Sequence, residues 1–192
     1  MEQMFRRIAY AAVVGVCAAT LVACGSDEPD YCRPHGAIGT RYAEIGAEAG
    51  PLGRCTGDEY QVDGGRIQDF EHGAMYWTSD TGAWEVYGDI GKKYAGDGGP
   101  ASPVGWPVSG ELSTPGDAGR FNRFQHGNIY ASAAGTHPVY GAIFDEWGRH
   151  GFEQGRFGFS TTDEFDISGG RQTNFQGGWI RWLDEGNRII TS

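Results

Sequence analysis

Apolar residues recur along the chain in two alternating patterns, and the pair of patterns occurs three times. The first pattern is helical, because Ile38, Tyr42 and Ile45 fall at positions i, i+4 and i+7 of one face. The same start returns at residues 90–94 and 143–147. Glycines on both sides limit each predicted helix to two or three turns. Helices this short are marginal alone, so packing must hold them.

The second pattern is that of short β-strands. Runs such as Arg66–Phe70 and Arg120–Phe124 are followed by a glycine turn, a second run, another glycine turn and a third run. Two glycine turns flanked by strands predict a three-stranded antiparallel meander. The predicted class is therefore α+β, mainly β, with three sequential repeats of a short helix plus a three-stranded meander.

The repeats start at Gly36, Gly88 and Gly141, which are 52 and 53 residues apart. This register predicts one repeat domain over residues 36–192, with units 36–87, 88–140 and 141–192. One helix on one small meander cannot bury its own apolar side, so neighbouring units must stack on each other. The spacing leaves open whether the units pack as a propeller-like ring or as an open arc.

The first 23 residues are typical of an export signal. Arg6 and Arg7 precede an apolar run, residues 8–22, that is too short for a comfortable membrane-spanning helix. The run ends in Leu-Val-Ala-Cys, which resembles a bacterial lipobox and predicts acylation of Cys24. We expect a lipoprotein signal peptide at 1–23 and a lipid-anchored tether at 24–35. The fold should then lie on the extracytoplasmic face of the cell membrane; an ordinary secretory signal is the alternative.

Two cysteines remain once Cys17 is removed with the signal and Cys24 is acylated. We expect Cys32 and Cys55 to form a disulfide, because an export compartment favours oxidation. No Cys-x-x-Cys motif occurs, and the histidines lack a ligand pattern, so we expect neither a metal nor a cofactor. The formal net charge of −10 makes nucleic acid a poor partner.

Six tryptophans lie among many tyrosines and phenylalanines. Those on the helical apolar face should be core. Aromatic rings in the predicted meander alternate in direction, so some can face outward and stack on sugar rings beside amides and acids. The core interpretation is the alternative for each of them. The candidate ligand-binding residues are Trp77, Trp84, Trp182, Tyr76 and Tyr130.

Each unit also repeats one glutamate and one arginine. Two glutamates could act as acid and base in glycoside cleavage. The favoured interpretation is structural, with each glutamate paired inside its own unit, because packing devices must be copied and catalytic sites rarely are. No nucleophile elbow or metalloprotease motif occurs, so we expect no catalytic residue. The repeated residues are Glu59, Glu111 and Glu164, with Arg66, Arg120 and Arg171.

These features resemble the LGFP repeat family, named for a Leu-Gly-Phe-Pro signature. The resemblance rests on Gly36–Ile38, Gly141–Ile143 and Phe124–Tyr130, and it extends over residues 36–192. The tetrad itself is degenerate, and its three copies read Leu52–Cys55, Val104–Pro107 and Phe157–Ser160.

The resemblance implies a function. Such repeats occur in exported proteins of actinobacteria with mycolic-acid envelopes, where they are thought to attach enzymes to the cell wall. We therefore expect a non-enzymatic envelope lipoprotein whose repeats bind cell-wall polysaccharide of the peptidoglycan or arabinogalactan type. The alternatives are a small cell-wall hydrolase or esterase that uses the repeat glutamates, and a scaffold that binds another envelope protein.

Overall fold

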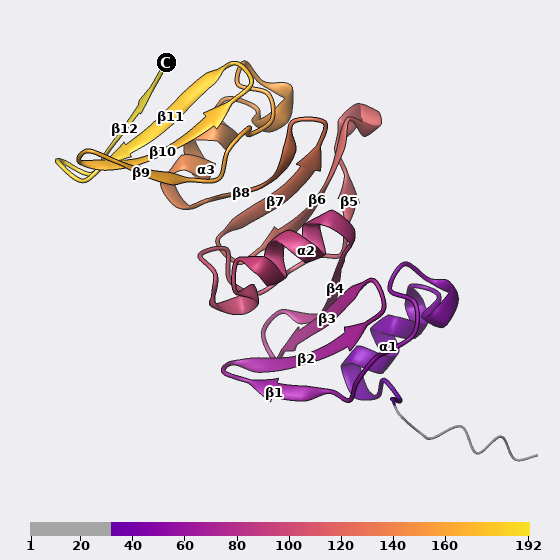
Figure 1. Ribbon diagram of the computed structural model, residues 1–192. Coiled ribbons are helices and arrows are strands. Elements are labelled where there is room, and N and C mark those ends of the chain that lie inside the picture. Colours follow the sequence, from indigo (N-terminus) through magenta and orange to yellow (C-terminus); the bar gives the residue numbers. More distant parts are fainter. Residues whose placement is uncertain (1–31) are drawn as a thin grey trace, which may run out of the picture.

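The computed structural model describes residues 32–192. The predicted signal peptide, Cys24 and most of the predicted tether lie outside the described residues. Figure 1 shows three successive units, each with a helix and a sheet of its own. Within the described part, no helix is long and apolar enough to cross a bilayer.

Each unit opens with the expected short helix. A glycine with positive φ follows each helix, at Gly46, Gly98 and Gly151, where a residue with a Cβ would be strained. A single 3₁₀ turn comes next in each unit. The helices are α1 (Gly36–Glu44), α2 (Gly88–Gly96) and α3 (Gly141–Arg149), and the turns are Ala47–Ala49, Gly99–Ala101 and Phe152–Gln154.

Each helix is followed by a four-stranded antiparallel sheet, so the prediction of a three-stranded meander was wrong by one strand. The missed strands are β1 (Tyr60–Val62), β5 (Leu112–Ser113) and β9 (Phe165–Ile167). They are two or three residues long and mostly exposed at a sheet edge, so they carry no alternation of burial.

The other nine strands are those that the pattern predicted. In unit 1 they are β2 (Gly65–Phe70), β3 (Gly73–Thr78) and β4 (Gly82–Tyr87). In unit 2 they are β6 (Gly119–Phe124), β7 (Gly127–Ser132) and β8 (Gly135–Tyr140). In unit 3 they are β10 (Gly170–Phe175), β11 (Gly178–Leu183) and β12 (Arg188–Thr191).

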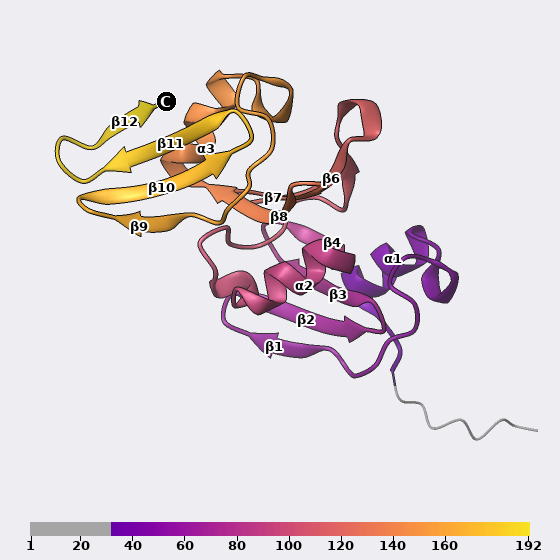
Figure 2. The ribbon, with the colours of Figure 1, turned by 45° about the horizontal axis from the view of Figure 1, so that its top comes forward.

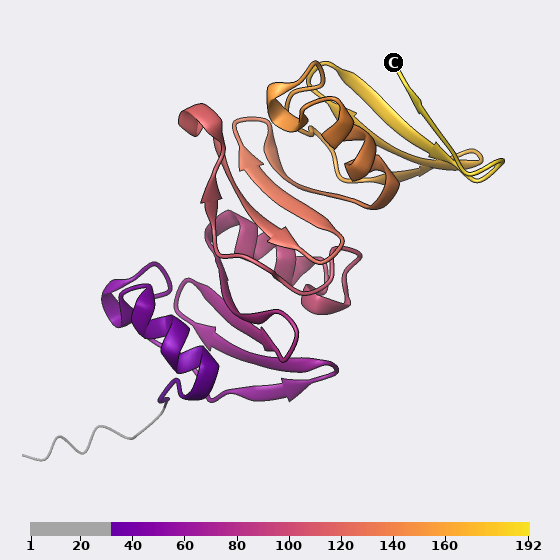
Figure 3. The same cartoon turned by 180° about the vertical axis from the view of Figure 1, so that it is seen from behind.

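The units follow one another in an open row. Figures 1 and 3 show α1 and β12 at opposite ends of that row, and the described strands form three separate sheets rather than a propeller-like ring. Helix α2 packs against β3 and β4 of the preceding unit as well as β7 and β8 of its own. Figure 2 shows this helix lying over the first sheet. Helix α3 likewise packs against β8 of the preceding unit and against β11 and β12 of its own.

The core therefore crosses the junctions between units. The central cluster joins Tyr76 of unit 1 to Ile90 and Tyr94 of unit 2. The predicted helical face is confirmed, because Tyr42, Tyr94 and Trp147 are 8%, 0% and 0% exposed. Shared burial of this kind supplies the packing that nine-residue helices need.

The predicted pairing of Cys32 with Cys55 is confirmed by a disulfide between them. Cys55 occupies the last position of the first tetrad. The bond therefore fixes the end of the predicted tether to unit 1.

Candidate functional site

In every unit the signature tetrad is joined to the helix of the same unit, by a buried first residue and a hydrogen bond to its glycine; we call this contact the latch. The first residues of the tetrads, Leu52, Val104 and Phe157, are at most 2% exposed. The aromatic residue of each helix donates a hydrogen bond to the carbonyl of the tetrad glycine. The three bonds are Tyr42 Oη to Gly53 O at 2.7 Å, Tyr94 Oη to Gly105 O at 2.9 Å, and Trp147 Nε1 to Gly158 O at 3.1 Å.

The third tetrad residue joins one unit to the unit before it. Trp106 lies so close to Gly65 that a Cβ on that glycine would come within 2.7 Å of the Trp106 ring. Phe159 lies against Gly119 in the same way, with a hypothetical Cβ at 3.1 Å. No described unit precedes unit 1, and there the third residue is Arg54, whose side chain is 71% exposed. The tetrads are therefore packing devices.

Two of the predicted ligand-binding aromatics are already engaged by protein groups. Tyr76 is 5% exposed and packs edge-on against Tyr94, with ring centroids 5.0 Å apart. Trp84 is half-buried, its Nε1 donates to the Thr81 carbonyl, and the Arg41 guanidinium lies 5.0 Å from its ring. Tyr76 is therefore part of the core, and one face of Trp84 is occupied by an arginine.

The structure brings Trp77 and Trp182 together with the repeated ion pairs. Arg66 donates to Glu59 at 2.6 Å, and Arg66 is the cross-strand neighbour of Trp77. In unit 3, Arg171 lies 2.5 Å from Glu164 and is the cross-strand neighbour of Trp182. Each set lines a small cavity, of about 170 Å³ in unit 1 and about 150 Å³ in unit 3.

Unit 2 departs from the expected glutamate–arginine pairing. Glu111 accepts a hydrogen bond from Tyr87 Oη at 3.2 Å, while Arg120 donates to Ser113 Oγ. Burial raises the pKa of Glu111 above 4.5, although the bond from Tyr87 and the charge of Arg120 act against this rise. Burial also raises the pKa of Glu164 in unit 3. The glutamates stand in three separate units, each with its own partner.

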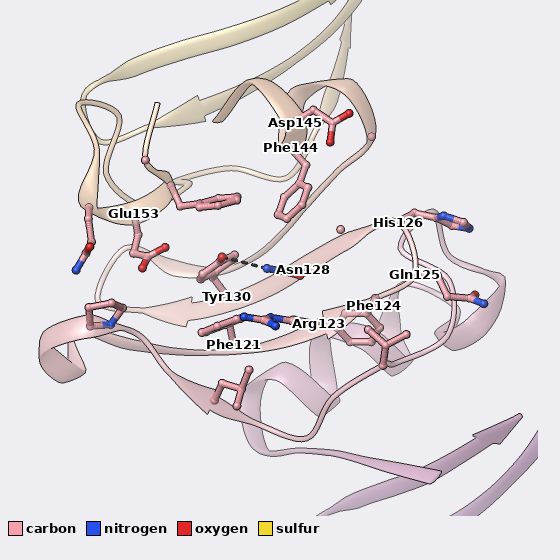
Figure 4. A pocket seen from close by; sticks show the side chains of 18 of the residues that line it. Phe121, Arg123, Phe124, Gln125, His126, Asn128, Tyr130, Phe144, Asp145 and Glu153 are labelled. Carbon is pink, nitrogen blue, oxygen red and sulfur yellow. Dashed lines mark hydrogen bonds between the residues drawn. The ribbon is translucent and has the colours of Figure 1, made fainter. Parts of the chain in front are cut away.

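A large cleft with a volume of about 930 Å³ lies between units 2 and 3 (Figure 4). One wall is the outer face of β6 and β7, and the other is α3 with the following 3₁₀ turn. Aromatic rings and polar groups alternate along it. Its lining includes Leu112, Phe121, Arg123, Gln125, His126, Asn128, Tyr130, Phe144, Asp145, Phe152 and Glu153.

The aromatic rings of the cleft are held in fixed positions. Phe121 and Tyr130 stack with centroids 5.0 Å apart and planes 14° apart. The Asn128 amide donates to Tyr130 Oη at 3.1 Å, and burial raises the pKa of Tyr130 to about 12, so its hydroxyl stays protonated. Phe144 faces this wall from unit 3 (Figure 4), and the ring of Phe152, which also lines the cleft, has its centroid 5.4 Å from that of Phe144.

Phe152 is the most unusual of these residues. Its φ is +52°, and its side chain is among the few exposed large hydrophobic groups, at 36%. The equivalent residue is Gly99 in unit 2 and Ala47 in unit 1, both with positive φ. A bulky residue in this conformation costs about 1–2 kcal/mol relative to an unstrained backbone. Strain of this kind, beside an open cleft, is a recognised mark of a functional position.

An equivalent cleft of about 570 Å³ lies between units 1 and 2. It is lined by the corresponding faces of β2, β3 and α2. Here Gly91 stands in the place of Phe144, Ala74 in that of Asn128, and Lys92 in that of Asp145. The architecture is therefore repeated, but the aromatic lining is concentrated at the second junction.

Of the predicted ligand-binding residues, only Tyr130 lines the larger cleft. Patterns within one unit could not reveal Phe121 or Arg123, since their surroundings come partly from the next unit. Phe144 and Phe152 did carry a signal: each replaces a glycine of unit 2 when the units are aligned. Among residues 32–192, no group of three or more His, Cys, Asp or Glu is placed to hold a metal ion.

The family model of the LGFP repeat matches residues 52–102 and 104–155. The chain belongs to the LGFP repeat family. This membership is consistent with an envelope-associated repeat protein. No curated protein matches the chain.

The matched LGFP repeats run from the tetrad of one unit to the 3₁₀ turn of the next. The second LGFP repeat therefore contains both walls of the larger cleft, because every lining residue falls between Val108 and Gln154. The first LGFP repeat contains the smaller cleft in the same way, between Asp69 and Ala95. Each cleft therefore lies within one repeat as the family model defines it, although its walls come from two neighbouring structural units.

Proposed function

We propose that this protein is a non-enzymatic envelope lipoprotein that holds wall polysaccharide, of the peptidoglycan or arabinogalactan type, in its LGFP repeats. One observation carries the proposal: the second LGFP repeat encloses an open cleft of about 930 Å³ lined by aromatic rings and hydrogen-bonding side chains. A volume at the top of the usual range for ligand sites can accept several sugar residues of a chain.

The cleft chemistry suits a sugar chain. Sugar rings present flat C–H faces to aromatic rings and hydroxyls to polar groups at the ring edge. Phe144 and Phe152 supply aromatic surface. Arg123 and Glu153 supply a donor and an acceptor along the same cleft (Figure 4). The Arg123 guanidinium lies 5.8 Å from the Phe121 ring centroid, which restrains its position.

The strained backbone at Phe152 supports the same proposal. Replacement by glycine, which unit 2 already has at this position, would relieve this strain while also removing the contact of the Phe152 ring with Trp147, whose centroids are 5.5 Å apart. A ligand-contacting role explains why a bulky ring stands there. This role leads to a variant that separates binding from stability.

The test is sedimentation of the full chain, in mild detergent, with isolated cell walls of a mycolate-containing actinobacterium. Phe152→Gly should weaken retention by about tenfold, equivalent to about 1.4 kcal/mol, with little change in Tm because relief of strain offsets lost packing. Ala47→Gly is the matched control, since it changes the equivalent position of unit 1 outside the cleft. Equal retention of Phe152→Gly and the unaltered chain would reject the cleft as the binding site.

Two treatments of the walls decide between the alternatives. Periodate oxidation of the glycan should abolish retention, and protease treatment should leave it intact. The opposite result would favour a scaffold that binds another envelope protein. Release of soluble wall fragments that stops in Glu59→Gln or Glu164→Gln would favour the hydrolase instead.

The lipid anchor is a separate part of the proposal. Because Cys32 is bonded to Cys55, only residues 25–31 separate the acylated Cys24 from the first fixed point of the fold. The eight residue steps from Cys24 to Cys32 span at most about 30 Å, so the repeats would stay close to the membrane surface. Cells fed an alkyne fatty acid should label the protein, and Cys24→Ala should abolish the label; labelling of the variant would contradict the anchor.

A further inference from the structure

Units 1 and 3 carry the same small pocket, which is distinct from the inter-unit clefts. In both units the pocket is lined by a glutamate, an arginine, a tryptophan and the first turn of the helix. The members are Glu59, Arg66 and Trp77 beside α1, and Glu164, Arg171 and Trp182 beside α3.

The pockets are rigidly built. The glutamate side chains are only 8% and 9% exposed, and each is bonded to the arginine of its own unit at 2.6 or 2.5 Å. The register of the sheet places the arginine directly beside the tryptophan, at Arg66–Trp77 and Arg171–Trp182. The Trp182 ring is further held by a bond from its Nε1 to Asn187 Oδ1. A ring face, a donor fork and an acceptor therefore meet in one cavity.

This combination selects a particular ligand chemistry. The charges of the ion pair cancel, so a neutral ligand enters without the cost of an unpaired buried charge. Adjacent hydroxyls can donate to the carboxylate and accept from the guanidinium, and these charge-assisted bonds are the stronger kind. A second ring lines each cavity, His35 in unit 1 and Tyr140 in unit 3. At about 150–170 Å³, each cavity is below the usual range for larger ligands and suits a single ring.

Unit 2 lacks the constellation as a whole. Ala131 occupies the position of the tryptophan, as the cross-strand neighbour of Arg120. Glu111 is bonded to Tyr87 and Arg120 to Ser113, so the ion pair is replaced by other bonds. A purely structural role for the ion pair would be expected in all three units. The pair instead occurs in the two units that have the tryptophan.

We propose that the pockets at Trp77 and Trp182 are two equivalent sites for one neutral sugar ring each. This inference rests on the proposed glycan-binding function and extends it, since a branch or end residue of a wall polysaccharide would occupy these sites. Two such sites on one rigid row would also raise the apparent affinity for a repetitive glycan through multivalency.

The test is a titration of the full chain, ¹⁵N-labelled at its tryptophan indoles, with galactose, arabinose and glucuronate. The indole signals are assigned with single Trp→Phe variants. The neutral sugars should shift the Trp77 and Trp182 signals saturably. The signals of Trp84 and Trp179 should stay in place, because an arginine covers one face of each ring, and the Arg41 guanidinium beside Trp84 already donates two bonds to Glu85. Glucuronate should bind about tenfold more weakly or worse, because its carboxylate would bring an unpaired charge to a guanidinium that the glutamate already neutralises.

Glu164→Gln should lower the affinity reported by Trp182 by about tenfold, through loss of a charge-assisted bond, and leave the Trp77 value within about twofold. The Trp77 site serves as an internal control for folding. No shift with the neutral sugars, or equal shifts at all four tryptophans, would overturn the inference. Wall retention measured on the same sample separates the outcomes: retention without sugar-induced shifts leaves the cleft function standing, and loss of both removes both proposals.

Discussion

The third residue of the first tetrad is a charged arginine, whereas that of the second and third tetrads is aromatic, and this difference shows what the third position does. Trp106 and Phe159 are 9% and 8% exposed and lie against glycines of the preceding unit. Arg54 stands at the same position of unit 1, where no described unit precedes it, and its side chain is 71% exposed. The remainder of the latch, including the bond from the helix aromatic to the tetrad glycine, is present in all three units. The third position therefore joins neighbouring units, while the other positions stabilise each unit internally.

Removal of a junction aromatic should have the largest effect. Trp106→Ala should lower the free energy of unfolding by about 3–5 kcal/mol, because a large buried ring and its contacts across the junction are lost. Arg54→Ala is the matched control and should change it by less than about 0.5 kcal/mol. Urea unfolding of the full chain measures both. Similar effects at the two positions would mean that the third residue acts within its own unit.

Crowding the same junction should have the next largest effect. Gly65→Ala places a methyl group 2.7 Å from the Trp106 ring and against the Trp77 carbonyl, which should cost about 1–3 kcal/mol. Gly57→Ala is the control, since a Cβ there meets nothing within 4 Å. If thermal unfolding shows equal Tm values for the two variants, then Trp106 does not need Gly65 to approach its surface.

The latch bond should be equally important in the first and second units. Tyr42→Phe and Tyr94→Phe each leave a tetrad carbonyl without its donor, which should cost about 1 kcal/mol in both. Guanidinium unfolding provides the measurement. A loss confined to Tyr94→Phe would show that unit 1, which also carries the Cys32–Cys55 disulfide, does not depend on this bond as unit 2 does.

The smallest changes in stability are expected from replacing the buried glutamates of units 2 and 3, and the two replacements should differ from each other. The pKa of Glu111 is raised by burial, so its ionisation disfavours the folded state as the pH rises above 4.5 and through the folded value. Glu111→Gln keeps an acceptor for Tyr87 and should be neutral or stabilising by a few tenths of a kcal/mol at pH 7. Burial raises the pKa of Glu164 too, but Glu164→Gln also loses the charge-assisted bond to Arg171, so it should be less favourable than Glu111→Gln, with a change within about 1 kcal/mol of the unaltered chain.

Melting curves at pH 4 and pH 7 test this pair of variants. The advantage of Glu111→Gln should be present at pH 7 and should shrink at pH 4, where the wild-type carboxyl binds a proton in both states. An advantage independent of pH would show that burial of the charge is not its cause.

The helices and nine of the twelve strands were predictable because their signals are local. Ile38 and Tyr42 share a helical face whatever lies beyond it, and glycine turns such as His72–Gly73 limit the strands. The edge strand Leu112–Ser113 was missed, since its residues are exposed and only pairing with β6 defines it. The family could be inferred in the same way, from the order of local features.

The candidate sites could not be predicted from local signals in the same way. Trp77 and Trp182 were predicted as ligand-binding residues and the ion pairs as structural ones, and only the sheet register showed that they share a pocket. The larger cleft was not predicted, because its walls come from different units and its lining residues have no common pattern within either.

The sequence by itself determined the repeat, the short helices and most strands, because spacing along one chain encodes each of them. It also determined the pairing of Cys32 with Cys55, because only these two cysteines remain once those of the predicted export signal and lipobox are set aside. Tertiary structure decided that the units form an open row, that α2 and α3 each cover two sheets, and that the second junction holds an aromatic cleft. The physical reason is that burial of a helix on a neighbouring sheet depends on surfaces far apart in sequence, and no local pattern specifies which surfaces meet.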